Sequence, residues 1–148
     1  MKRKKILFVC TGNTCRSPMA EALLRSLIKK RKIKWWDVAS RGINAEIDGG
    51  LSYNSKLVLE ELGISLPDFK ARQLTQKLIE GSTLVVTMTE AQKQLIEDCG
   101  IVKSVKDICG FDVPDPYGGD ITIYRLTRDM LIKVCNAIIE EYILKFEE

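Results

Sequence analysis

Residues 5–17 read KILFVCTGNTCRS, and the predicted fold starts from this segment. It opens with a short apolar run, from Lys5 to Val9, of the kind that forms a strand buried on both faces. A glycine and an asparagine follow at once, which is typical of a tight loop. From Pro18 to Lys30 the apolar side chains then keep helical spacing. The predicted order is therefore strand, tight loop, helix.

The rest of the chain continues the alternation. Further strands are predicted at 35–39, 83–88 and 104–108, and further helices at 54–62, 75–79, 90–98 and 124–146, with Asn54 and Thr89 as helix caps. Alternating strands and helices predict a parallel α/β sheet with helices on both faces. No repeat, low-complexity segment or linker interrupts the pattern. We therefore expect one domain over residues 1–148.

The composition excludes several classes of protein. The 148 residues are 45% hydrophobic and 29% charged, which is typical of one globular domain with a core. A net charge of +3 is too small to indicate a nucleic-acid partner. The first apolar run is too short for a signal peptide, and no segment approaches the roughly 20 apolar residues of a membrane span. We expect a cytoplasmic protein without membrane or nucleic-acid partners.

Histidine is absent, and this restricts the possible chemistry. Histidine-dependent hydrolases and phosphatases are excluded, so any acid or base must be a carboxylate, thiol, lysine or tyrosine. The five cysteines form an odd set without an export signal or a Cys-x-x-Cys pair, which argues against a disulfide framework. We expect neither a metal nor a cofactor.

The loop after the first strand carries the residues for phosphate chemistry. Five residues separate Cys10 from Arg16, and Ser17 leads into the helix. Backbone N–H groups, the helix dipole and the guanidinium can converge on one oxyanion, and the same field favours a thiolate. Ser17 is placed to donate a hydrogen bond to the Cys10 sulfur. The residues expected to contact the bound group are Thr11, Gly12, Asn13, Thr14, Cys15, Ser17 and, from a later loop, Tyr117.

Two alternatives to this interpretation exist. Cys10 could be a buried cysteine at the end of a strand, followed by an ordinary turn. A nucleotide-binding phosphate loop is the other possibility, but the sequence has neither Gly-x4-Gly-Lys-Ser/Thr nor Gly-x-Gly-x-x-Gly. The combination of strand, glycine, asparagine, Arg-Ser and helix favours an activated cysteine over both alternatives.

A proton donor is needed for the leaving group, and without histidine an aspartate is the natural choice. Residues 114–119 read PDPYGG, where prolines restrict the backbone around Asp115 and glycines let the loop fold over a cleft. Asp112 and Asp120 compete for this role. A plain surface turn is the alternative for the whole segment.

Together, VCTGNTCRSPMAE at 9–21 and DPYGG at 115–119 resemble the low-molecular-weight protein-tyrosine phosphatase family. The resemblance implies a three-layer sandwich with a four-stranded parallel sheet. It implies Cys10 as nucleophile, Arg16 as phosphate clamp, Asp115 as acid and then base, and a phosphocysteine intermediate. Phosphorylated proteins or peptides would be the substrates and inorganic phosphate the product.

Thr14 bears on which phosphorylated side chain the enzyme would accept, because tyrosine-specific members of the family usually carry an aliphatic residue at this position. With ITIY at 121–124, the sequence looks like the bacterial protein-arginine phosphatase branch. Tyr117 replaces the phenylalanine expected in that branch, so phosphotyrosine and phosphoarginine both stay open. Many members also have a histidine near the loop, where this chain has Phe69 and Lys70, so the hydrogen-bond support of the loop is expected to differ.

Cys15 lies inside the same loop and predicts redox control, because a neighbouring thiol can trap oxidised Cys10 as a disulfide. A small buried side chain at a tight turn is the alternative. For the whole protein, the second candidate function is a thiol-coupled arsenate reductase, which needs a cysteine pair near the site, and Cys99 and Cys109 are far apart in the sequence. A non-catalytic phosphate-binding module is the third.

Overall fold

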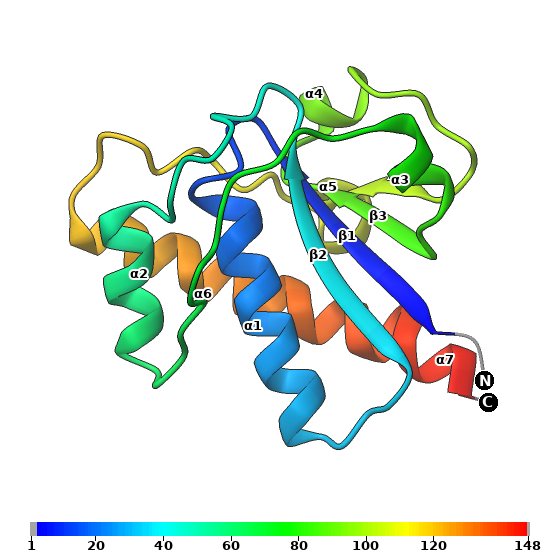
Figure 1. Cartoon of the computed structure of the whole chain (residues 1–148). Coiled ribbons are helices and arrows are strands. Elements are labelled where there is room, and N and C mark those ends of the chain that lie inside the picture. Colours follow the sequence, from blue (N-terminus) through cyan, green and yellow to red (C-terminus); the bar gives the residue numbers. More distant parts are fainter. Residues whose placement is uncertain (1–2, 148) are drawn as a thin grey trace.

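A parallel sheet lies at the centre of the computed structural model, which describes residues 3–147 (Figure 1). The strands follow the order β2-β1-β3-β4, and all three neighbouring pairs are parallel. Strand β1 therefore lies between β2 and β3. The strands are β1 (Lys4–Cys10), β2 (Trp36–Gly42), β3 (Leu84–Thr87) and β4 (Val102–Ser104).

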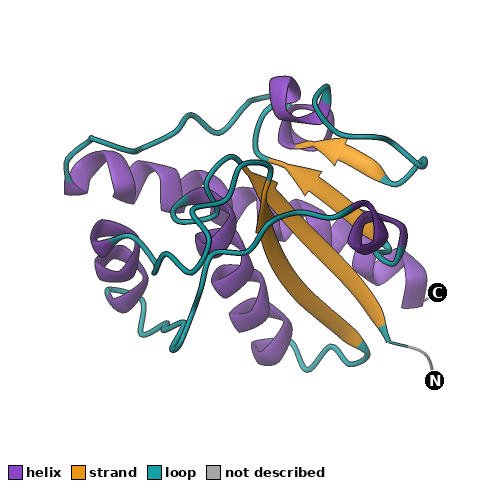
Figure 2. Ribbon diagram, turned by 45° about the horizontal axis from the view of Figure 1, so that its top comes forward, coloured by secondary structure: helices purple, strands orange, loops and turns teal. Residues whose placement is uncertain are grey.

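Helices connect the strands and cover both faces of the sheet (Figure 2). The last helix continues through a π-helical segment, η1, into α7. The helices are α1 (Arg16–Lys30), α2 (Tyr53–Glu60), α3 (Gln76–Glu80), α4 (Glu90–Lys93), α5 (Val105–Cys109), α6 (Ile121–Ile138), η1 (Ile139–Ile143) and α7 (Leu144–Glu147).

Each face of β1 contributes to a different core. Ile6 and Phe8 point to one side and belong to the larger core, which includes buried residues of α1 and α6. Leu7 and Val9 point to the other side and pack in a smaller core with Ile79 of α3. This alternation is the period-two pattern of a strand, and here both faces are apolar because both are covered. The predicted three-layer α/β sandwich is confirmed.

The carboxyl end of β1 is a topological switch point. After β1 the chain passes through α1 into β2, which pairs with one edge of β1, and the later strand β3 pairs with the opposite edge of β1. Connections that diverge in this way open a crevice beyond the strand ends, where ligands of open α/β sheets bind. Cys10 is the last residue of β1 and therefore lies at this crevice.

Two predicted elements were wrong. The strand predicted at 104–108 instead ends at Ser104, which caps helix α5. The Ser104 side chain accepts from the Asp107 amide, and the Asp107 carboxylate accepts from the Ser104 amide. The predicted helix 90–98 ends at Lys93. Asp98 instead accepts hydrogen bonds from the amides of Gly100 and Val102, which turns the chain into β4.

Helix ends also differ from the prediction. Asn54 does not cap α2, since Ser52 accepts from the Ser55 amide and begins the helix one residue earlier. The last helix starts at Ile121 instead of Tyr124, because the Asp120 side chain accepts from the Ile123 amide. The Thr89 cap of α4 is confirmed.

Two general features of residues 3–147 bear on function. No helix in this range is both long and apolar enough to cross a membrane. No group of three or more cysteine and carboxylate side chains in the same range is arranged to hold a metal ion. Met1, Lys2 and Glu148, which belong to the predicted domain 1–148, lie outside the described residues.

Candidate active site

The loop after β1 is held by its carbonyl groups. The carbonyl oxygens of Cys10, Thr11 and Gly12 accept from the amides of Ile43, Asn44 and Glu46 at 2.9, 2.9 and 3.2 Å. In a planar trans peptide, the following N–H points away from the carbonyl. The N–H groups of residues 11–13 are therefore turned away from segment 43–46, and the left-handed backbone of Asn13, with φ at 59°, continues the curl. Such successive amides form an anion-binding concavity.

Cys10 and Ser17 are in direct contact. The Cys10 side chain is 2% exposed, and its Sγ lies 2.8 Å from the Ser17 Oγ. The Asn13 amide nitrogen donates to the same Ser17 oxygen at 2.9 Å. Because Ser17 Oγ accepts from Asn13, its own hydrogen is free to point at the sulfur. The hydroxyl can therefore donate to a Cys10 thiolate, which accepts only, and such a bond stabilises the negative charge.

A buried polar network supports the loop from behind. Asn13 also donates to Ser40 Oγ at 3.0 Å, and Ser40 donates to a Glu21 carboxylate oxygen at 2.7 Å. Burial raises the pKa of Glu21. The Arg72 amide completes the set by donating to Asn13 Oδ1 at 3.0 Å. The sequence analysis missed Glu21 and Ser40, although the buried face of a helix carrying a lone glutamate is a usable signal.

Arg16 and Asp115 face each other across the loop. Arg16 is 5% exposed, and its guanidinium donates to the Val113 carbonyl at 3.0 Å. A second guanidinium nitrogen lies 3.8 Å from Asp115 Oδ2. The other oxygen of Asp115 accepts from the Tyr117 amide at 3.1 Å, which fixes the carboxylate in the turn between the two prolines. Asp115 therefore stands where a bound phosphoryl group would meet solvent.

The competing aspartates have structural positions. Asp112 accepts from the Glu90 amide at 2.9 Å, and Asp120 caps α6. Neither lines the cavity that contains Cys10, whereas Asp115 does. Of the three aspartates that the sequence offered as candidates, only Asp115 therefore lies where it can reach a group bound at Cys10.

The cavity has a volume of about 350 Å³ and gathers residues from three loops. It brings together most of the predicted site residues and adds Asn44 and Glu46, which the sequence analysis missed. Asn13 and Ser17 are fully buried and lie behind the cavity wall. Tyr117 is 80% exposed, at the rim. The lining residues are Cys10, Thr11, Gly12, Thr14, Cys15, Arg16, Asn44, Glu46, Asp115 and Tyr117.

Cys15 is 5% exposed and packs at the start of α1. Its Sγ lies 3.6 Å from the hydroxyl of Tyr124 on α6. Burial raises the pKa of Tyr124 to about 12, so this phenol stays protonated at neutral pH. Cys99 and Cys109, the pair considered for arsenate reduction, do not line the cavity.

A thiol beneath a curl of backbone amides, with a buried arginine and an exposed carboxylate above it, defines the class of cysteine-dependent phosphatases. The comparisons with known proteins name the family. Residues 5–145 match the family model described as low molecular weight phosphotyrosine protein phosphatase, and the chain belongs to this family. The sequence-based prediction of the family is confirmed.

The similar proteins include both protein-arginine phosphatases and protein-tyrosine phosphatases. The chain is 36% identical over 144 residues to a protein-arginine-phosphatase of Bacillus subtilis, covering 92% of this chain and 95% of the relative. It is 37% identical over 141 residues to the low molecular weight protein-tyrosine-phosphatase PtpB of Staphylococcus haemolyticus, covering 90% and 96%. A solved structure of the YwlE arginine phosphatase with a phosphorylated active-site serine matches with a TM-score of 0.86 and 36% identity, covering 93% of this chain and 97% of that one.

Proposed function

We propose that this chain is a protein-arginine phosphatase that removes the phosphoryl group from phosphoarginine side chains of proteins. The observation that carries the proposal is the lining of the cavity, in which Thr14 of the catalytic loop is joined by the acidic residues Glu46 and Asp115. The names of the Bacillus subtilis relative and of the matched YwlE structure support the same substrate.

The acceptor-rich lining favours a guanidinium over a phenol. A phosphorylated guanidinium keeps several N–H donors beside the phosphorus, whereas the ring of phosphotyrosine has none. Glu46 and Thr14 offer acceptors for these donors at the wall of the cavity. A site built to bond a polar group discriminates strongly against an analogue that lacks it, because the acceptors of the site are then left unpaired.

The proposed mechanism has two steps. In the first, the Cys10 thiolate attacks phosphorus, the S–P bond forms, the P–N bond breaks, and the protonated Asp115 gives its proton to the leaving nitrogen. In the second, Asp115 takes a proton from water, the water oxygen attacks phosphorus, and the S–P bond breaks to release inorganic phosphate. Arg16 and the loop amides hold the phosphoryl oxygens through both steps.

The experiment measures phosphate release under reducing conditions from phosphoarginine and phosphotyrosine peptides of matched sequence. Wild type is expected to prefer phosphoarginine, and Cys10→Ser is expected to be inactive on both. Thr14→Ile and Glu46→Gln are each expected to lower the preference for phosphoarginine over phosphotyrosine roughly 10- to 100-fold. Each variant removes from the enzyme an oxygen that could accept a hydrogen bond from the substrate guanidinium. Thr14→Ser keeps the hydroxyl and is the matched control.

A wild-type preference for phosphotyrosine that Thr14→Ile leaves unchanged would overturn the arginine assignment. Activity on neither peptide would overturn the phosphatase function itself.

Redox protection by Cys15 also belongs to this proposal. Hydrogen peroxide oxidises the Cys10 thiolate to a sulfenic acid, which the Cys15 thiol attacks to form a disulfide and release water. Cys15→Ala is then expected to lose the ability to recover activity after peroxide followed by a thiol reductant. A location in the cytoplasm and the absence of nucleic-acid partners remain predictions.

A further inference from the structure

A second cavity borders the same segment as the catalytic one. Its volume is about 610 Å³. Asn44 and Glu46 line the catalytic cavity, and the next two residues, Ile47 and Asp48, line the second. The two cavities therefore lie on the same short segment, with only one peptide bond between the last residue of one lining and the first of the other.

The second cavity is strongly basic. Its lining contains four cationic side chains, from Lys5, Arg41, Arg72 and Lys77, and one acidic side chain, from Asp48. Among residues 3–147, neither Arg41 nor Arg72 forms an ion pair with a carboxylate. This part of the surface therefore carries an excess of positive charge, which Asp48 in the lining and Glu21 near Arg41 neutralise only in part.

The Arg41 side chain is held in place at the end of strand β2, which is an edge strand of the sheet. It is half-buried near the end of β2, and its guanidinium donates to the Ser40 carbonyl at 2.7 Å. Burial first, and then the nearby Arg72, lower the pKa of Arg41. The carboxylate of Glu21 opposes this effect only as the smallest of the three causes. Two guanidinium groups that repel each other are stabilised when an anion binds between them.

The backbone of Arg72 connects this cavity to the catalytic loop. The Arg72 carbonyl accepts from the Gly42 amide at 2.9 Å, and the Arg72 amide donates to Asn13 Oδ1 at 3.0 Å. Figure 1 shows the segment before α3 crossing the end of β2 at this point. The basic cavity is thus fixed in position relative to Asn13, whose side chain holds the Ser17 hydroxyl that contacts Cys10.

We propose that the Arg41–Arg72 cavity is a substrate subsite that binds a negatively charged group lying a few residues from the phosphorylated side chain. The group is an acidic side chain or a second phosphoryl group. An extended peptide advances roughly 3.3 Å per residue, so a substrate anchored at Cys10 passes segment 44–48 and reaches the arginines within a few residues. The inference rests on the proposed function, since it requires that the chain dephosphorylates protein side chains.

The test compares kcat/KM on three phosphoarginine peptides of one length. In the first peptide, aspartates flank the phosphoarginine on both sides. In the second, asparagines replace these aspartates. The third has the same asparagines, except that one residue on each side of the phosphoarginine is phosphoserine. The same three peptides with phosphotyrosine remove any dependence on the arginine assignment. Wild type is expected to favour the aspartate peptide over the asparagine peptide roughly 5- to 10-fold, because two exposed ion pairs each contribute modestly. Raised salt should reduce the ratio.

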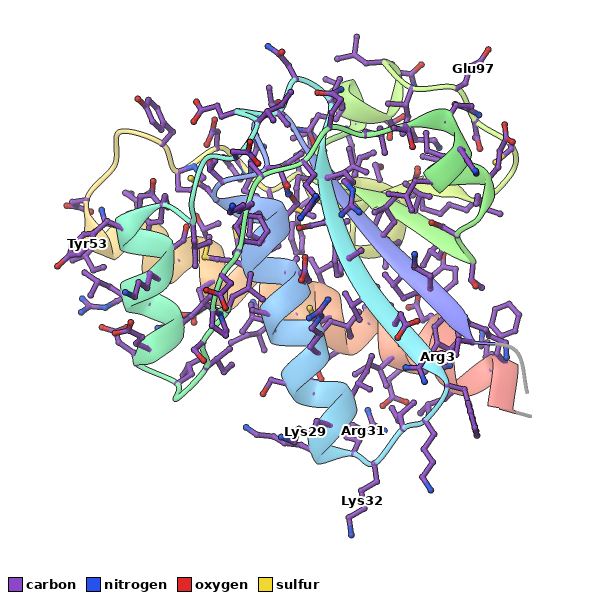
Figure 3. All side chains as sticks on the ribbon, in the orientation of Figure 1. Arg3, Lys29, Arg31, Lys32, Tyr53 and Glu97 are labelled. Carbon is purple, nitrogen blue, oxygen red and sulfur yellow. The ribbon has the colours of Figure 1, made fainter. Side chains whose placement is uncertain are left out.

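Arg72→Gln and Arg72→Glu examine the subsite directly. The quantity compared is the acidic-to-neutral ratio within each variant, in which any change in loop support cancels. Arg72→Gln is expected to bring this ratio close to 1, and Arg72→Glu to invert it. Lys29→Gln, at the end of α1 away from the loop (Figure 3), is the matched charge control and should keep the wild-type ratio.

The outcomes separate the two proposals. Hydrolysis of the peptides and of para-nitrophenyl phosphate, with an acidic-to-neutral ratio near 1 in wild type, would overturn the subsite and leave the phosphatase function intact. An equal loss of the ratio in Lys29→Gln would show general charge attraction and would also overturn it. A preference confined to the phosphoserine peptide would restrict the subsite to phosphoryl groups, whereas equal preference for both acidic peptides would support binding of any anion. No hydrolysis of any substrate would overturn the proposed function and the subsite with it.

Discussion

The Cys10 Sγ lies 2.8 Å from the Ser17 Oγ, and the Asn13 amide holds that hydroxyl from the other side at 2.9 Å. A hydrogen bond to a charged group contributes about 1.5–3 kcal/mol. Ser17→Ala is therefore expected to lower kcat roughly 10- to 100-fold on para-nitrophenyl phosphate, by destabilising the thiolate as nucleophile and as leaving group. Ser82→Ala, at a buried serine that bonds the Leu78 carbonyl, is the control. An unchanged kcat in a folded Ser17→Ala protein would contradict the role of this contact.

Asp115 is the proposed proton donor, and of the three candidate aspartates it is the one that lines the cavity. Asp115→Asn keeps the shape of the side chain but cannot donate, so kcat should fall on the order of 10²- to 10⁴-fold. Asp120→Asn is the matched control, because asparagine caps a helix about as well as aspartate does and this residue lies outside the cavity lining. Steady-state kinetics on phosphoarginine peptides measures both. An equal loss in both variants would contradict the assignment of Asp115.

Gly42 has no room for a side chain. A Cβ there would lie 2.7 Å from the Thr11 carbonyl oxygen and 3.0 Å from the Asn13 Cβ, both in the catalytic loop. Gly42→Ala is expected to displace the loop, lower the free energy of unfolding by about 1–3 kcal/mol and reduce activity.

Gly50 offers the matched control for this substitution. An added Cβ there has no heavy atom within 4 Å, so Gly50→Ala should change neither quantity appreciably. Urea unfolding and a kinetic assay of both variants test the pair. Wild-type activity in Gly42→Ala would show that the loop tolerates the added methyl group.

Glu61 joins the end of α2 to α6. Hydrogen bonds from Arg125, and then from Arg128, lower the pKa of Glu61 from its usual 4.5 to about 2. Because the folded pKa lies below the unfolded one, the stabilisation is present above about pH 4.5 and is lost as the pH falls towards 2. Glu61→Gln should therefore lower the urea midpoint at pH 7, with a smaller difference from wild type near about pH 3.

The control is Glu97→Gln, at a surface glutamate far from α2 (Figure 3). It should match wild type at both pH values. A Glu61→Gln effect that is equal at neutral and acid pH would rule out the ion pairs as its cause.

Local sequence was sufficient for the chemistry of the loop. Cys10, Arg16 and Ser17 are close in sequence, and a strand followed by a helix leaves few ways to connect them, so their convergence was predictable. Elements with a clear period, such as β1 and α1, were predicted for the same reason. Short elements near β4 were mispredicted, because the Ser104 and Asp107 side chains bond the backbone and override the strand preference of the β-branched Val105 between them.

The family, the α/β order of elements and the loop that carries the proposed nucleophile and its arginine follow from the sequence alone, because each depends on residues close in the chain or on a pattern that repeats along it. Three relationships became visible only in the folded chain: which aspartate faces Arg16, the support of Asn13 by Ser40 and Glu21, and the shared cavity of Arg41 and Arg72. The physical reason is that parallel strands bring together residues separated by long crossover connections. Their contacts depend on strand order and register, which no local pattern contains.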